Sequence, residues 1–166
     1  MIRIPHRAVN PKIAELKRLL IFGGLSPSQL RMLASNLDEV TIPAGEKFVS
    51  KGRSNDTFFI ILEGDVDLAV GGVRETVGPG GVIGLPSMFT RLDSTADAVA
   101  RTPVRALVAS HRQFNSLVSH PEIAIRFKAA MFDRLRDEVY QMTHAASPPS
   151  KAKAASKAKA APKAKK

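Results

Sequence analysis

Residues 57–84 read TFFIILEGDVDLAVGGVRETVGPGGVIG, and this stretch decides the fold class. It opens with a continuous apolar and β-branched run over 57–62, which predicts a buried strand. Apolar and polar residues then alternate over 66–70, which predicts a half-buried strand. Gly71-Gly72 predicts a hairpin turn into a further strand over 73–77. Short strands joined by Gly-rich turns favour a β-barrel or a β-sandwich.

The same pattern continues on both sides of this stretch. Upstream, residues 40–42 alternate between apolar and polar, and the turn at 43–45 leads to a short strand at 48–49. Downstream, a strand pair is expected over 97–109, with a break near Pro103. The sequence therefore predicts a mainly β domain.

Two helices are predicted before the strands. Apolar residues at helical spacing predict a helix over 11–22, which ends at Gly23. A second helix is expected over 27–37, with Ser26 as its N-cap and Pro27 in its first turn. The apolar positions of the first helix are Ile13, Leu16, Leu19 and Leu20.

Two more helices are predicted after the strands, a short one over 112–118 and a long one over 121–143. An apolar stripe runs along the long helix, and at its start we expect the stripe to pack on the β domain. The stripe is formed by Ile123, Phe127, Met131, Leu135, Val139 and Met142, and is widened by Ile125 and Phe132. It is broader than a strict heptad seam, so whether it also supports a homodimer stays open.

We divide the chain into three segments: an irregular N-terminus at 1–10, a folded domain at 11–144 and a tail at 145–166. The tail repeats SKAKAA at 150–155 and 156–161 and has no large apolar residue after the long helix. Such a segment cannot offset the entropy cost of ordering, so it is predicted to be disordered.

Positive charge is concentrated in the tail. The formal net charge is +10, but the last 20 residues hold seven lysines and no acidic residue. The remaining chain has 18 basic and 15 acidic residues, a net of +3. A polyanionic partner, DNA or ribosomal RNA, is therefore predicted for the tail rather than for the domain. The tail lysines are Lys151, Lys153, Lys157, Lys159, Lys163, Lys165 and Lys166.

Composition excludes several classes of protein. The chain has no Cys, which excludes disulfides and thiolate metal sites. No apolar run approaches the roughly 20 residues of a membrane helix, and no secretory signal opens the sequence. We expect a cytoplasmic protein, associated with the nucleoid or the ribosome if the tail binds there, with no membrane partner.

Several local motifs occur together at consistent separations. They are F-x-G-L-S at 22–26, G-E at 45–46, G-x-x-x-D-x-F-x-I-I at 52–61, L-x-G-x-V at 62–66 and G-P-G-x-x-x-G at 78–84. With the order of helices and strands, they resemble the cyclic nucleotide-binding domain family of catabolite activators, kinase regulatory subunits and gated channels. The resemblance spans roughly residues 14–140. It implies a double-stranded β-helix, or jelly-roll, barrel with flanking helices.

The resemblance also implies a phosphate-binding cassette, aligned here over residues 84–100. In the family a Glu accepts from the ribose 2′-hydroxyl, while an Arg and the N–H groups of a short helix neutralise the cyclic phosphate. Here Gly84 is retained, but Leu85 stands at the Glu position and Ser94, preceded by Asp93, at the Arg position. Each lost contact costs roughly 1.5–3 kcal/mol, so cyclic AMP binding is predicted to weaken by at least hundreds of fold.

Two interpretations of the altered cassette remain open. A different ligand binds there, or the site is vestigial and packed shut behind Leu85-Pro86, which the sequence favours. Arg91, three residues before Ser94, offers a replacement cation from a shifted loop, although such an Arg is more often exposed. The candidate cassette positions are Gly84, Leu85, Pro86, Ser87, Arg91, Ser94 and Thr95.

No constellation of catalytic residues is present, so we expect a protein that is not an enzyme and has no cofactor. Asp93 and Asp97 are expected to be turn and surface residues rather than an acid–base pair. No serine lies in a nucleophile elbow, and no Lys-Ser/Thr follows the glycines of 78–84 to make a P-loop. The four histidines are scattered and have no metal-ligand spacing; they are His6, His111, His120 and His144.

Two functional hypotheses follow. In the first, a cyclic-nucleotide-binding fold with a degenerate cassette presents a surface to an unknown protein partner, while the tail binds nucleic acid. In the second, the domain senses cyclic AMP, cyclic GMP or another small anion and signals through the long helix. Related regulators continue into a helix-turn-helix and dimerise through this helix. Here a tail resembling those of linker histones and actinobacterial nucleoid proteins follows, with a simple solubility tail as the alternative.

Overall fold

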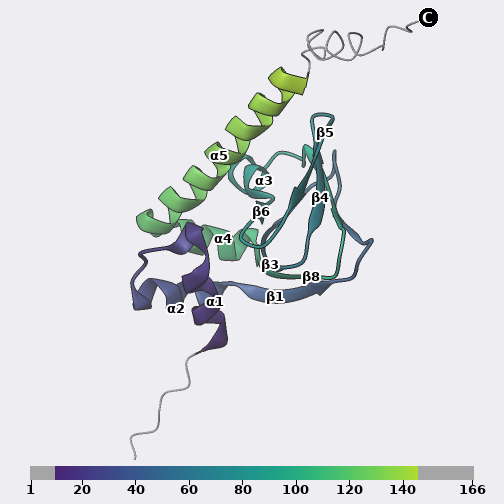
Figure 1. Ribbon diagram of the computed structural model, residues 1–166. Coiled ribbons are helices and arrows are strands. Elements are labelled where there is room, and N and C mark those ends of the chain that lie inside the picture. The colour runs from purple at the N-terminus through teal and green to yellow at the C-terminus, as the bar shows by residue number, and fades with distance from the viewer. Residues whose placement is uncertain (1–9, 146–166) are drawn as a thin grey trace, which may run out of the picture.

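The computed structural model describes residues 10–145 as two facing antiparallel sheets with helices along one side (Figure 1). The first sheet has the order β1 (Asp38–Ile42), β8 (Val104–Ser110), β3 (Thr57–Glu63) and β6 (Val82–Ile83). The second has the order β2 (Lys47–Val49), β7 (Ala96–Ala100), β4 (Val66–Val70) and β5 (Val73–Val77). The helices are α1 (Pro11–Arg18), the 3₁₀ turn η1 (Leu20–Phe22), α2 (Pro27–Asn36), α3 (Leu85–Thr90), α4 (His111–Val118) and α5 (Pro121–Ala145).

The predicted mainly β fold with flanking helices is confirmed, in the form of a sandwich. No ladder joins the two sheets within residues 10–145, so the expected barrel is open. β3 is central in its sheet, between β8 and β6, which explains its continuous apolar run. The predicted hairpin pairs Val70 with Val73, and its two loop residues, Gly71 and Gly72, have φ values of 58° and 83°.

The second N-terminal helix is capped as expected, but the first is shorter than predicted. The Ser26 hydroxyl accepts from the backbone N–H of Gln29, and the backbone N–H of Ser26 donates to the side-chain oxygen of Gln29. The two bonds form a capping box for α2. The prediction of a helix over 11–22 is wrong, because α1 ends at Arg18. Leu16 and Phe22, six residues apart, would lie on different faces of one helix, and the break lets both be buried.

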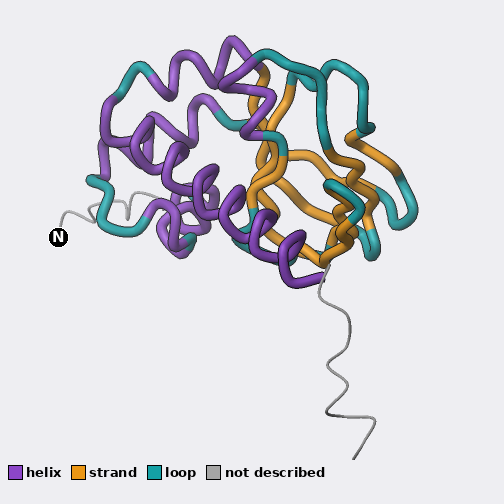
Figure 2. The backbone as a smooth tube through the Cα atoms, turned by 90° about the horizontal axis from the view of Figure 1, so that it is seen from above, coloured by secondary structure: helices purple, strands orange, loops and turns teal. Residues whose placement is uncertain are grey.

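Two apolar clusters fill the interior, and they differ in composition. The aromatic cluster lies between the helices and the sheet that contains β3, and its large members are Phe22, Phe58, Phe114 and Phe127. Phe127 contacts three of these rings, at centroid distances of 5.2–5.9 Å. The aliphatic cluster lies between the two sheets and consists mainly of Val, Ile and Ala. Figure 2 shows the helices gathered to one side of the strands.

Arg105 of β8 ties the N-terminal helix to the sheet. Its guanidinium bonds Glu39 at 3.0 Å and Glu63 at 2.7 Å, and it also forms an ion pair with Glu15 of α1. This hydrogen-bonded partner lowers the pKa of Glu15. One cation thus holds three carboxylates that lie far apart in the sequence.

α5 is buried in the core at its start and becomes exposed toward its C-terminal end. Ile123 and Phe127 are fully buried, which confirms that the stripe packs on the domain at its start. Leu135 is 38% exposed and Val139 is 59% exposed. No helix of the described residues is long and apolar enough to cross a membrane.

Candidate ligand cavity

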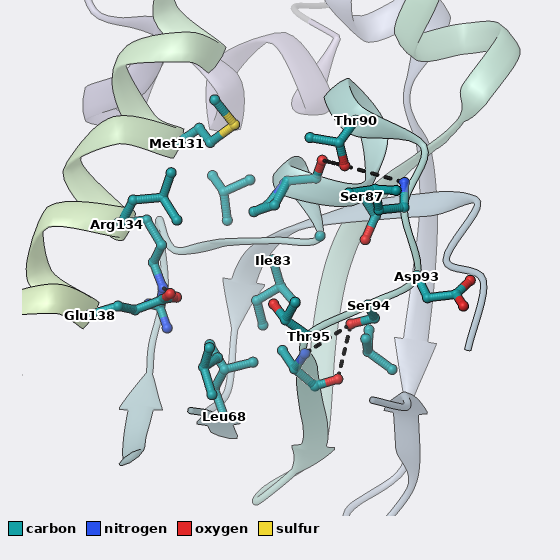
Figure 3. Close-up of a pocket in the computed structure, with 18 residues that line it drawn as sticks. Leu68, Ile83, Ser87, Thr90, Asp93, Ser94, Thr95, Met131, Arg134 and Glu138 are labelled. Carbon is teal, nitrogen blue, oxygen red and sulfur yellow. Dashed lines mark hydrogen bonds and ion pairs between the residues drawn. The ribbon is translucent and has the colours of Figure 1, made fainter. Parts of the chain in front are cut away.

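A cavity of about 300 Å³ lies between the second sheet, α3 and α5 (Figure 3). Its walls are largely aliphatic, and hydroxyl groups of the cassette lie at one side. Met131 and Arg134 of α5 reach toward it from the opposite side. The lining residues are Val49, Leu68, Val70, Val82, Ile83, Gly84, Pro86, Ser87, Thr90, Leu92, Asp93, Ser94, Thr95, Ala96, Met131, Arg134, Leu135 and Glu138.

Gly84 shapes the start of the cassette. It is the residue before α3 and has a φ of 96°. A Cβ there would lie 2.9 Å from the carbonyl oxygen of Thr57 and 3.3 Å from Cα of Phe58, so a side chain would collide with β3. Pro86 follows in the first turn of α3 and has no N–H, which removes one donor from the end of the helix that would face a phosphate.

Leu85 does not point to the cavity. It is buried and belongs to the aromatic cluster with Met88 and Phe114. Leu85, which the family resemblance places at the ribose-binding carboxylate, is therefore used for packing. Since a space of about 300 Å³ remains beside it, the interpretation of a site packed shut is wrong.

Ser94, which the family resemblance places at the position of the Arg, forms local hydrogen bonds. Its hydroxyl donates to the carbonyl of Ala96 at 3.0 Å and accepts from the N–H of the same residue at 3.1 Å. Its backbone bonds Gly52 and Arg53. Ser94 thus closes a turn before β7, while Thr95 lines the cavity beside it.

Arg91 does not supply the missing cation to this cavity. It has a φ of 59° and lines a second, smaller cavity of about 180 Å³ on the other side of α3, with Asn55, Asp56 and His111. The first cavity shares Ser87 and Leu92 with it but not Arg91.

Asp97 serves the local structure, as the sequence suggested. It pairs with Lys47 at 2.6 Å and accepts from the N–H of Lys51 at 3.0 Å. These hydrogen bonds lower the pKa of Asp97. Asp93 is exposed at the rim of the cavity. No group of three His, Asp or Glu side chains within residues 10–145 is arranged to hold a metal, and His6 lies outside these residues.

Sequence reasoning missed the charged residues that α5 contributes. Arg134 donates from Nε to Glu138 at 3.2 Å and forms an ion pair with Glu75 of β5. Both α5 side chains are mostly buried, with 22% and 18% exposed. They follow Met131 by three and seven residues, so they share a helical face with the apolar stripe. This spacing could have indicated from the sequence that Arg134 and Glu138 face the domain.

The geometry agrees with the comparison to known families. The family model named "Cyclic nucleotide-binding domain" matches residues 39–120. This range contains seven of the eight strands in full, together with α3 and α4. This chain belongs to the cyclic nucleotide-binding domain family. The jelly-roll arrangement implied by the sequence motifs is thereby confirmed.

Three known proteins are similar to this chain. The "CRP-like cAMP-activated global transcriptional regulator" of Mycobacterium tuberculosis is 31% identical over 129 residues, which are 73% of this chain and 57% of that protein. The N-terminal domain of a transcriptional regulator from Streptomyces coelicolor is 30% identical, with a TM-score of 0.58, over 77% of this chain and 94% of that one. A cyclic nucleotide-binding domain from Methylobacillus flagellatus shares the fold, with a TM-score of 0.69 and 21% identity over 84% of each chain. The chain thus spans little more than half of the curated relative.

Proposed function

We propose that this chain is a non-enzymatic regulatory protein whose cassette does not hold a cyclic nucleotide, and whose tail binds nucleic acid. One observation carries the first part: the hydroxyl at the position of the phosphate-binding cation, on Ser94, is already bonded to Ala96. Leu85, at the position of the ribose acceptor, is buried away from the cavity.

Electrostatics support the same conclusion. Arg134 is the cation among the described lining residues, and two carboxylates, Glu75 and Glu138, already bind it. Asp93 adds a further negative charge at the rim. A cyclic phosphate would lose its hydration without gaining a free cation, which is unfavourable in a partly buried site.

Calorimetry with cyclic AMP and cyclic GMP tests this proposal. We expect no binding at micromolar concentrations by the full chain. Restoring the two family residues, in Leu85→Glu and Ser94→Arg together, is expected to gain affinity, and Ser94→Arg alone to gain part of it. Micromolar affinity in the unaltered chain would overturn the proposal.

A cyclic-nucleotide sensor is the second candidate, and the open cavity favours it. A space of about 300 Å³ beside the cassette is large enough for a small ligand. The relative from M. tuberculosis is named as cAMP-activated. The calorimetry above decides between the two candidates.

The tail proposal rests on charge, because its lysines lie outside the described residues. Seven lysines without an acidic residue can contact phosphates without sequence preference. Full occupancy on duplex DNA would give a salt slope of about −6. Mobility shifts with DNA and RNA should be lost in a chain of residues 1–146 and in a variant with all seven lysines changed to Gln. Equal affinity for nucleic acid in all three proteins would refute binding by the tail and indicate that the tail serves only solubility.

We also propose that α5 forms a homodimer. Ile125, Phe132 and Val139 are exposed and follow one another at seven-residue spacing, as in a helix seam. Arg136 lies on the same face, and Asp133 and Asp137 balance its charge at 3.4 and 3.7 Å. Light scattering should report a dimer that Phe132→Asp converts to a monomer, while Gln141→Asp, away from the seam, leaves it intact. A monomeric unaltered chain at micromolar concentration would refute the dimer.

A further inference from the structure

The charge at the α5 side of the cavity is unfavourable for binding an anion. Arg134, Glu138 and Glu75 form one connected group with two carboxylates and one guanidinium. Its net charge is therefore −1. The side chains of Arg134 and Glu138 are mostly buried, so water screens this charge less than it would on an open surface.

Among the lining residues that the structure describes, none on the opposite side of the cavity compensates this charge. Asp93 lies at that rim and forms no hydrogen bond or ion pair with another residue of 10–145 (Figure 3). Lys47 is paired with Asp97, which is not in the lining. Arg91 lines the second cavity. Among the described residues, the lining thus favours positive charge in a bound molecule.

Most of the remaining lining residues are apolar and favour a ligand that is mostly apolar. Leu68, Val70 and Ile83 form the floor between the sheets, and Met131 and Leu135 close it from α5. A cavity of about 300 Å³ is at the small end of ligand pockets. Filling it with an apolar group removes that surface from water and restores the van der Waals contacts that an empty space lacks.

We propose that this cavity binds a small molecule with an apolar body and one protonated amine, the amine placed against Glu138. The proposal rests on the proposed function, since it requires that the cavity is not a cyclic-phosphate site. Nε of Arg134 occupies one oxygen of Glu138, and a carboxylate has further acceptor positions for an ammonium group.

Three probes of one shape and different charge test this proposal on the full chain. They are 4-phenylbutylamine, 4-phenylbutanol and 4-phenylbutyrate, measured by calorimetry at neutral pH, where the amine is protonated. We expect the amine to bind at least tenfold more tightly than the alcohol, and the acid more weakly than either. Equal or tighter binding of the acid would overturn the proposal.

Two variants locate the binding. Glu138→Gln should reduce the affinity of the amine relative to that of the alcohol about tenfold. Ala96→Phe, which fills the cavity, should abolish both, and its thermal unfolding shows whether it is folded. Amine binding that survives Ala96→Phe in a folded protein would place the probe elsewhere and refute the site.

The outcomes separate this inference from the proposed function. Micromolar cyclic AMP binding refutes the proposed function, and the amine site with it. Absence of cyclic AMP binding, together with no preference for the amine, refutes only the amine site.

Discussion

The two apolar clusters of this domain differ in how closely they are packed. The aromatic cluster is filled by rings in edge-to-face and stacked contact, with Phe127 touching three others. The aliphatic cluster is built from smaller side chains and borders a cavity of about 300 Å³. The helical side is closely packed, whereas the aliphatic side borders open volume between the second sheet, α3 and α5.

The greatest loss of stability is expected in the aromatic cluster. Phe127→Ala removes a fully buried ring from contact with Phe22, Phe58 and Phe114, and should lower the free energy of unfolding by about 3–5 kcal/mol. Urea unfolding measures it. Leu20→Ala, at a position 97% exposed, is the control and should change stability by less than about 0.5 kcal/mol. A loss below about 1 kcal/mol at Phe127 would contradict the assigned role of the cluster.

The next effect is expected where the two clusters meet the cassette. Gly84→Ala combines a φ of 96° with a Cβ 2.9 Å from a backbone oxygen of β3, and should cost about 2–3 kcal/mol. Gly80 has a φ of 86° but nothing within 4 Å of its Cβ position, so Gly80→Ala should cost only about 1 kcal/mol. Thermal unfolding of both variants separates backbone strain from collision. Equal losses would show that the close approach to β3 has no effect.

The sequence predicted the framework but not how its parts meet. Alternation, turn glycines and the Ser26 cap are local signals, and the strands over 57–77 and the start of α2 followed them. The early end of α1 was not predicted, because it depends on Phe22 reaching Phe127 across the fold. Periodicity alone could not show that break.

The candidate cavity was predicted only in part, for a similar reason. The family resemblance places the cassette over residues 84–100, with Leu85 and Ser94 at its two key positions, but it does not show whether the space beside them is filled. That depends on the crossing of α5, which brings Arg134 to Glu75 from 59 residues away in sequence. Local sequence patterns do not predict such a crossing. The charged residues that line the cavity could therefore be identified only from the structure.

A smaller effect is expected at Arg105, which joins α1 to the sheet beside the aromatic cluster. Arg105→Met keeps the apolar stem but leaves Glu15, Glu39 and Glu63 without their cation, and should cost about 1–2 kcal/mol near pH 7. Arg101→Met, at an exposed position that bonds Thr76, is the control and should be nearly neutral.

The effect of Arg105→Met should depend on pH in a defined direction. The pKa of Glu15 is lowered in the folded protein, so this pair stabilises the fold above the ordinary glutamate range. The stabilisation is lost as the pH falls through the lowered value. The difference between the variant and the unaltered chain should therefore narrow below about pH 4. A gap that widens in acid would exclude this network as its cause.

A substitution at the cavity itself should have little effect on stability, and it tests directly whether the two clusters differ in packing. Ala96→Val adds two methyl groups at a position that lines the empty space, so it should change the free energy of unfolding by less than about 0.5 kcal/mol. Ala109→Val makes the same change in the aromatic cluster, where Ala109 is fully buried, and should cost about 1–3 kcal/mol through overpacking. Urea unfolding of the two variants compares identical chemistry in the two clusters. Similar losses would mean that the space beside Ala96 is closed in solution, because only a position facing open volume can accept the added methyl groups without displacing its neighbours.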